Sequence, residues 1–79
     1  MTVMQDLEII FRDVFDDEDI QINVDTTAND IDGWDSLAQI RLILQIEKLF
    51  SLHFDASEID KLENVGQMVE LISQKQANE

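Results

Sequence analysis

Ser36 is the side chain of this sequence that is best placed to do chemistry. It lies in the stretch Asp32-Gly33-Trp34-Asp35-Ser36-Leu37, where a polar, Asp-rich segment gives way to an apolar helical pattern. A serine becomes a strong nucleophile when an adjacent base takes its proton, and this stretch holds no histidine or lysine. We therefore interpret Ser36 as an exposed hydroxyl that a second enzyme modifies.

A hydrolase site fits these residues poorly. Gly33-x-x-Ser36 lacks the second glycine and the preceding strand of a nucleophile elbow. The base would have to be His53, the only histidine of the chain. We expect no catalytic residue, and we expect His53 at or near the surface, close to the end of the helix that follows Ser36.

A calcium-binding loop fits poorly as well. With Gly33 at the glycine position of an EF-hand loop, position one is Ala28 and position twelve is Gln39. That loop needs acidic ligands at both positions, so we expect no dedicated metal site. Two groups of acidic residues, at 16–19 and at 30, 32 and 35, could bind divalent cations weakly, which would relieve the repulsion between their carboxylates. The group at 16–19 is equally consistent with a solvated acidic turn.

Length and composition predict an all-α fold. The 79 residues suit a single domain over 1–79, and 44 % of them are hydrophobic, which is enough for one small core. Proline is absent, only two glycines occur, and helix-favouring residues are common. We expect a small bundle of three main helices plus one short helix, with a long first loop and a monomeric state.

The formal net charge of −13 limits the choice of partners. Nucleic acids and anionic membrane surfaces attract basic faces, so we expect neither as a partner. An acidic chain is steered toward enzymes with basic docking patches. No apolar run is long enough to span a membrane, so the sequence reads as soluble and cytoplasmic. With no cysteine in the chain, any thioester chemistry needs sulfur from a prosthetic group.

Apolar spacing places the helices. Positions 3, 7, 10 and 14 repeat at helical intervals, which predicts a helix over 3–15. Asp35 is a suitable N-cap for a helix over 36–50. Asp55-x-x-Glu58 resembles a capping box for a short helix through about Leu62, and Asn64-x-x-Gln67 resembles one for a last helix over 65–75. The tail from Gln76 to Glu79 is expected to fray.

The segment over 16–35 reads as a long loop, which in so small a domain is usually functional. Four apolar residues are spaced as anchors to the core: Ile20, Ile22, Val24 and Ile31. The alternation at 20, 22 and 24 also fits a short strand. We expect Trp34 to pack the loop against the helix over 36–50 and favour this over a partner contact.

The helix over 36–50 has two apolar faces. With Ser36 at zero, one arc from about 220° to 340° predicts the core face, formed by Leu42, Ile43, Ile46, Leu49 and Phe50. A second stripe between about 40° and 100° holds Leu37, Ile40 and Leu44, flanked by Arg41, Glu47 and Lys48. Either the loop or the short helix buries this stripe, or it is an exposed docking surface. We favour docking, with Leu37, Ile40, Arg41 and Leu44 as the partner contacts.

These residues together resemble acyl and peptidyl carrier proteins. The resemblance rests on Gly33-Trp34-Asp35-Ser36-Leu37, on the helix end Ile46-Glu47-Lys48-Leu49-Phe50 and on Asn64-Val65-Gly66-Gln67-Met68-Val69. It covers nearly the whole chain. Asp-Ser-Leu alone is a weak motif, and its position before this helix, in an acidic chain of this length, makes the resemblance specific.

The resemblance implies a modification and a function. A phosphopantetheinyl transferase would move 4′-phosphopantetheine from coenzyme A onto the hydroxyl of Ser36, supplying the base and Mg²⁺. Asp35 matches the position that helps to orient the metal and phosphate. The arm ends in a thiol, on which acyl groups would travel as thioesters between loading and transferring enzymes of fatty acid, polyketide or related biosynthesis.

The sequence departs from the familiar fatty-acid carriers in one helix. Those carriers have acidic residues where this chain has Ala38 and Arg41, and the helix over 36–50 sums to +1 by formal count. Trp34 is more typical of stand-alone carriers in polyketide, aminoacyl or polysaccharide-modifying systems. The sequence therefore favours a dedicated carrier. Alternatives are an aminoacyl carrier, such as a D-alanyl or peptidyl one, and an acidic helical adaptor that is never modified.

The charge predicts a response to salt. Because 18 acidic residues face only five lysines and arginines, repulsion within the compact state should be screened by NaCl or MgCl₂. We expect the melting temperature to rise by about 4–8 °C for each kcal/mol of repulsion removed. Thermal melts followed by circular dichroism at increasing salt check this, and a melting temperature that ignores ionic strength would contradict it.

Overall fold

The computed structural model describes residues 2–77 and contains four α-helices in that range. They are α1 (Val3–Val14), α2 (Ser36–Phe50), α3 (Ala56–Asp60) and α4 (Val65–Ala77). No strand forms within residues 2–77, where one isolated bridge joins Thr27 to Asn64. The prediction of an all-α fold with three main helices and a short one is confirmed. No helix among these residues combines the length and the hydropathy needed to cross a bilayer.

Side chains cap the first turns of α1 and α2. Thr2 and Gln5 form a capping box, in which the Gln5 amide donates to Thr2 Oγ1 over 3.1 Å and the Thr2 amide donates to Gln5 Oε1 over 3.0 Å. Asp35 caps α2, because its Oδ1 accepts a hydrogen bond from the Ala38 amide over 2.9 Å. Each cap satisfies an amide that has no partner inside its helix. The predicted role of Asp35 as N-cap is confirmed.

The capping boxes predicted for α3 and α4 form to different extents. Glu58 accepts a hydrogen bond from the Asp55 amide over 2.9 Å, as the capping box requires. Asn64 Oδ1 accepts from the Gln67 amide over 2.9 Å. The Gln67 side chain, however, accepts from the Glu63 amide rather than from that of Asn64. The second capping box is therefore only half formed.

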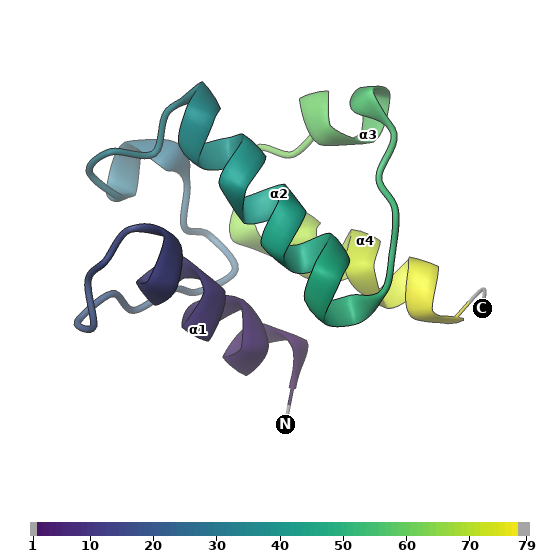
Figure 1. The fold of residues 1–79 in the computed structure, drawn as a ribbon, viewed down its shortest axis with the longest axis horizontal. Helices are drawn as coiled ribbons and strands as arrows, with labels where there is room; N and C mark the ends of the chain where they lie inside the picture. Colours follow the sequence, from purple (N-terminus) through teal and green to yellow (C-terminus); the bar gives the residue numbers. More distant parts are fainter. Residues whose placement is uncertain (1, 78–79) are drawn as a thin grey trace.

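The core lies between α1, α2 and α4. Figure 1 shows α2 crossing in front of α4 with α1 below it, while α3 lies within the connection that leads from α2 to α4. Burying an aliphatic or aromatic side chain contributes about 1.5–3 kcal/mol to the stability of the fold. The side chains buried between α1, α2 and α4 therefore supply most of the apolar stabilisation. The fully buried large side chains of the core are Leu7, Phe11, Leu42, Ile46, Val65, Met68 and Ile72.

A charged pair on α1 holds the start of the long loop. Arg12 Nη2 lies 2.8 Å from Glu8 Oε1, and both residues are on one face of α1. Glu8 Oε2 accepts a hydrogen bond from the Ile22 amide over 3.1 Å, and Arg12 Nε donates to the Ile20 carbonyl over 2.9 Å. These bonds hold Ile22 in the core and Ile20 in a half-buried position, and Ile31, farther along the loop, is half-buried as well. Three of the four predicted anchors are thus confirmed.

The fourth anchor, Val24, was predicted wrongly. Its side chain is 54 % exposed, and its backbone makes the contact, because the Val24 carbonyl accepts from the Gly66 amide over 2.9 Å. The Thr26 carbonyl likewise accepts from the Val65 amide over 2.9 Å. A Cβ at Gly66 would lie 2.8 Å from the Val24 oxygen, so only glycine allows this close approach.

Two further predictions need correction, and the alternative of a short strand is excluded. Leu49 was predicted in the core but is 55 % exposed, because it lies at the margin of the apolar arc in the last turn of α2. The segment at 20–24 forms no strand, since side chains of α1 take the hydrogen bonds a partner strand would take. The predicted frayed tail is helical through Ala77, and residues 78–79 lie outside the described range.

Helix α3 is tied to α4 by one ion pair. Lys75 Nζ lies 3.0 Å from Glu58 Oε1 and 5.5 Å from the centre of the Phe54 ring. The hydrogen bond from the Asp55 amide, helped by Lys75, holds the pKa of Glu58 below its ordinary value of 4.5. A carboxyl group whose pKa is lowered by folding stabilises the protein while it is ionised.

Replacing a core leucine should cost far more than replacing an exposed one. Leu42 is fully buried and Leu44, two residues later, is 59 % exposed. We expect Leu42→Ala to lower the free energy of unfolding by about 2–5 kcal/mol, and Leu44→Ala to change it by no more than about 0.5 kcal/mol. Urea denaturation in added salt measures both, and equal losses would contradict the assignment of the core face.

The ion pair between Glu58 and Lys75 should stabilise the protein at neutral pH and should lose this effect in acid. We expect Glu58→Gln to lower the urea midpoint at neutral pH, since the variant loses the charge that faces Lys75. The difference from wild type should disappear as pH falls below 4.5 and through the lowered pKa of Glu58, where the wild-type group is also neutral. Glu70→Gln, an exposed change of the same charge on α4, is the control. A Glu58→Gln effect that persists in acid would argue against the pair.

Candidate functional site

Ser36 is the first residue of α2, and its side chain is exposed. Its hydroxyl has no hydrogen-bond partner among residues 2–77. Gly33 adopts φ 86°, a left-handed conformation that favours glycine, and so turns the chain into the helix. Ser36 is thus held in place by its backbone while its oxygen stays free to react.

Trp34 fixes the loop that precedes Ser36. Its ring lies edge-on to Phe11, with centroids 5.2 Å apart at 83°, and 6.3 Å from the ring of Phe15. Its Nε1 donates to Gln39 Oε1 over 2.8 Å. Edge-to-face rings are a favourable aromatic arrangement, and the indole N–H is satisfied. Trp34 thus packs the loop as predicted, but its ring packs against Phe11 and Phe15 at the end of α1, and its hydrogen bond to Gln39 is what ties it to α2.

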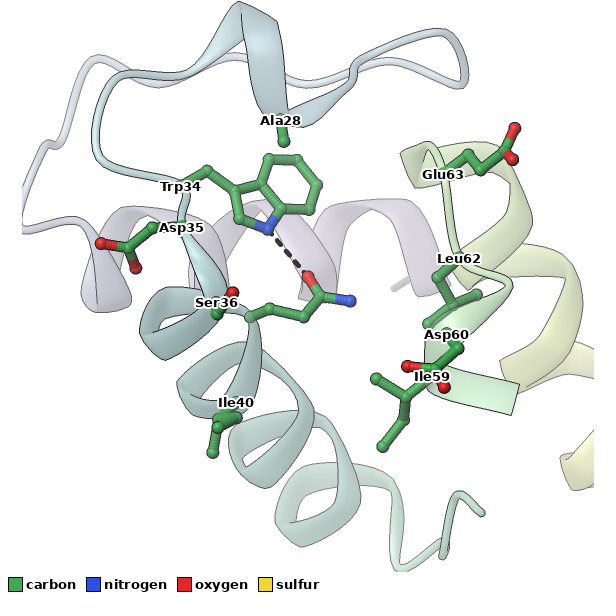
Figure 2. A pocket seen from close by; sticks show the side chains of 10 residues that line it. Ala28, Trp34, Asp35, Ser36, Ile40, Ile59, Asp60, Leu62 and Glu63 are labelled. Carbon is green, nitrogen blue, oxygen red and sulfur yellow. Dashed lines mark hydrogen bonds between the residues drawn. The ribbon is translucent and has the colours of Figure 1, made fainter. Parts of the chain in front are cut away.

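An open cavity of about 530 Å³ lies beside Ser36. Figure 2 shows Ser36 and Ile40 on α2 at one side of it and Ile59 and Leu62 at the other. The walls are largely apolar, while Asp35, Asp60 and Glu63 add carboxylates to its lining.

Six residues that line this cavity were not predicted as site residues: Ala28, Gln39, Ile59, Asp60, Leu62 and Glu63. Ile59 and Leu62 are spaced as i and i+3, which places them on one side of a helical turn. That spacing was available as a signal. The hydrogen bond from Trp34 to Gln39 could not be predicted from the sequence, because it depends on how the loop folds back onto α2.

Among residues 2–77, no histidine or lysine lines the cavity beside Ser36. Helix α2 rises by about 21 Å from its first to its last residue, and His53 lies beyond its far end. The His53 side chain is 83 % exposed and its Nδ1 lies 3.3 Å from Glu47 Oε2. Its predicted surface position is confirmed. Within residues 2–77, no cluster of histidine and carboxylate side chains is arranged to hold a metal ion.

The apolar stripe beside Ser36 is exposed. The exposed fractions are 58 % for Leu37, 56 % for Ile40 and 59 % for Leu44. The alternative that the loop or the short helix buries this stripe is therefore wrong. Arg41, which we predicted as a partner contact with these three, is also exposed.

The surroundings of Ser36 suit a phosphate ester. The hydroxyl is reachable and bonded to nothing that a modification would have to displace. A 15-residue helix begins at this residue, and the N-terminus of a helix favours a negatively charged phosphate. The cavity beside it offers apolar walls to whatever the phosphate carries.

Comparisons with known proteins point to the same chemistry. A family model described as the phosphopantetheine attachment site matches residues 5–72. The chain is also similar to a holo acyl carrier protein from Geobacter metallireducens, whose structure was solved in solution by NMR. The two are 42 % identical, with 99 % of this chain and 90 % of that chain covered and a TM-score of 0.91. The chain belongs to the phosphopantetheine-attachment family of acyl carrier proteins, whose cofactor is a covalently attached 4′-phosphopantetheine.

Proposed function

We propose that this chain is an acyl carrier protein that holds acyl groups as thioesters on a phosphopantetheine arm attached to Ser36. The observation that carries this proposal is the free, exposed hydroxyl of Ser36 at the start of α2 and at the edge of an apolar cavity. Family membership supplies the cofactor. The residue is our inference from geometry and from the motif around it.

The attachment step needs little from the chain itself. The Ser36 oxygen forms a bond to the phosphorus that carries pantetheine in coenzyme A, and the phosphoanhydride bond to the nucleotide part breaks. The serine proton passes to a base of the transferase, since no histidine or lysine within residues 2–77 lines the cavity beside Ser36. Asp35 Oδ1 is held by the Ala38 amide, which fixes the carboxylate beside the reacting serine. We propose that Asp35 helps to orient the metal and phosphate on the transferase.

When bound, the cofactor supplies a flexible arm that ends in a thiol. This thiol is the sulfur that the chain lacks, because it has no cysteine. The chain's own part is to present the arm and shelter what it carries. The walls of Ile40, Ile59 and Leu62 suit an apolar acyl chain. Members of this family are non-catalytic carriers, and we propose that this chain likewise catalyses no reaction itself.

We propose that the chain works as a single domain over residues 1–79, as a monomer and in the cytoplasm. Its partners would be a phosphopantetheinyl transferase and enzymes that load or remove acyl groups through basic or apolar docking patches. The exposed stripe supports Leu37, Ile40, Arg41 and Leu44 as contacts. Family membership sets aside the unmodified adaptor. A fatty acid or polyketide pathway, or a dedicated aminoacyl one, would use the same arm.

One experiment tests the attachment residue. Apo-protein is incubated with coenzyme A, Mg²⁺ and a broad-specificity phosphopantetheinyl transferase, and its intact mass is recorded. We expect wild type to gain one phosphopantetheine and Ser36→Ala to gain none. Ser57→Ala, which removes an exposed serine from α3, is the matched control and should be modified like wild type. A Ser36→Ala variant that still gains the group, or a wild type that never does, would refute the proposal.

A further inference from the structure

Helix α2 differs in charge from the rest of the chain. It holds Arg41 and Lys48 against Glu47, a formal net charge of +1. Since the whole chain is −13, the other residues sum to −14. By the same count α1 and α3 are each −2 and α4 is neutral. Positive charge is therefore concentrated on the helix that begins with Ser36.

The two cations of α2 are not used by the fold. Arg41 and Lys48 are exposed and form no ion pair within residues 2–77. Asp13 of α1 lines a shallow hollow with Arg41 but does not pair with it. By contrast, Arg12 and Lys75 each lie within 3.0 Å of a carboxylate that belongs to the same folded chain. In a chain with 18 acidic residues, both cations of α2 remain available to a partner.

These cations border the exposed apolar stripe. On a helix with 100° per residue, Arg41 and Lys48 fall about 20–40° beyond its edge. We call this surface the α2 face and define it by Leu37, Ile40, Arg41, Leu44 and Lys48. All five side chains are exposed, and none of them is acidic.

The single acidic residue of α2 is drawn away from this face. Glu47 Oε2 accepts a hydrogen bond from the Phe54 amide over 2.8 Å and lies 3.3 Å from His53 Nδ1. Its side chain is only 21 % exposed. The α2 face therefore offers a partner apolar and cationic groups alone.

The charges also follow an order along the helix. Asp35, Asp60 and Glu63 line the cavity beside Ser36, so the end that carries the attachment residue is acidic. Arg41 and Lys48 follow Ser36 by five and twelve residues, which is about 8 and 18 Å along the axis. A partner that faces both parts at once would need cationic groups near its active-site entrance and carboxylates farther away.

We propose that the α2 face docks onto an acyl-transferring enzyme whose contact surface surrounds an apolar pocket with carboxylates. Opposite charges across an interface fix orientation and select partners, and arginine and apolar side chains are typical of interface cores. Carboxylates at that place would also repel carriers that have an acidic second helix. The proposal rests on the proposed function, because the partner acts on the arm at Ser36.

The test uses the tagged chain and its variants produced in the native host, where each partner is present. Intact mass of the purified protein separates the unmodified, phosphopantetheinylated and acylated forms. We expect Arg41→Glu and Lys48→Glu each to lower the ratio of acylated to phosphopantetheinylated protein by about fivefold or more, the factor that corresponds to about 1 kcal/mol of lost contact. Ile40→Glu should do the same by removing the apolar anchor.

Two controls separate docking from net charge. Lys61→Glu makes the same change of two charges at an exposed residue after α3, and we expect its ratio to stay within about twofold of wild type, as for a residue outside the contact. Arg41→Lys keeps the charge and should retain most of the acylation. Thermal melts check that each variant folds. If a charge-reversal variant fails to fold, Arg41→Gln or Lys48→Gln takes its place and removes the charge instead. The ratio of acylated to phosphopantetheinylated protein is then measured in the same way.

The outcomes distinguish this inference from the proposed function. If wild type from the host carries phosphopantetheine and an acyl group but the α2 variants match it, the docking proposal is overturned and the carrier function stands. If Lys61→Glu falls as far as Arg41→Glu, net charge explains the effect and the proposal is overturned as well. If wild type carries no acyl group, the proposed function fails and the docking proposal fails with it.

Discussion

The packing of Trp34 against Phe11 and Phe15 is the contact on which the site depends. It holds the end of a long loop against α1, and its bond to Gln39 ties the same residue to α2. Asp35 then caps the helix at the next position. These contacts decide where α2 begins. They thereby place Ser36 at an exposed helix terminus while the residues on both sides of it are held.

The same arrangement explains how a long loop can be ordered in a small domain. Its backbone hydrogen bonds go to side chains of α1 near its start and to the first amides of α4 farther on. Glu8 and Arg12 act as a clamp, and the carbonyls of Val24 and Thr26 cap α4. Ordering so many residues costs conformational entropy, which these hydrogen bonds and the burial of Ile22 help to offset. The ordered loop ends at the turn that leads into Ser36.

Much of this could be predicted from the sequence, because local patterns carry it. Helical spacing predicts α1 and α2, capping boxes predict α3 and α4, and the Asp before Ser36 predicts the start of α2. What could not be predicted depends on distant contacts. Val24 was expected in the core, but its carbonyl rather than its side chain makes the contact with α4. Leu49 lies at the margin of the apolar arc, where helical spacing alone does not decide whether another helix covers the side chain, and it is exposed.

The central claim, that Ser36 carries the cofactor, can be tested directly on protein purified from its host. Trypsin cuts after Arg12 and Arg41, and the peptide over 13–41 contains a single serine, Ser36. Tandem mass spectrometry of that peptide locates any adduct. We expect phosphopantetheine, free or acylated, on Ser36 of this peptide. An unmodified peptide 13–41 from protein that carries the group on another peptide would contradict it.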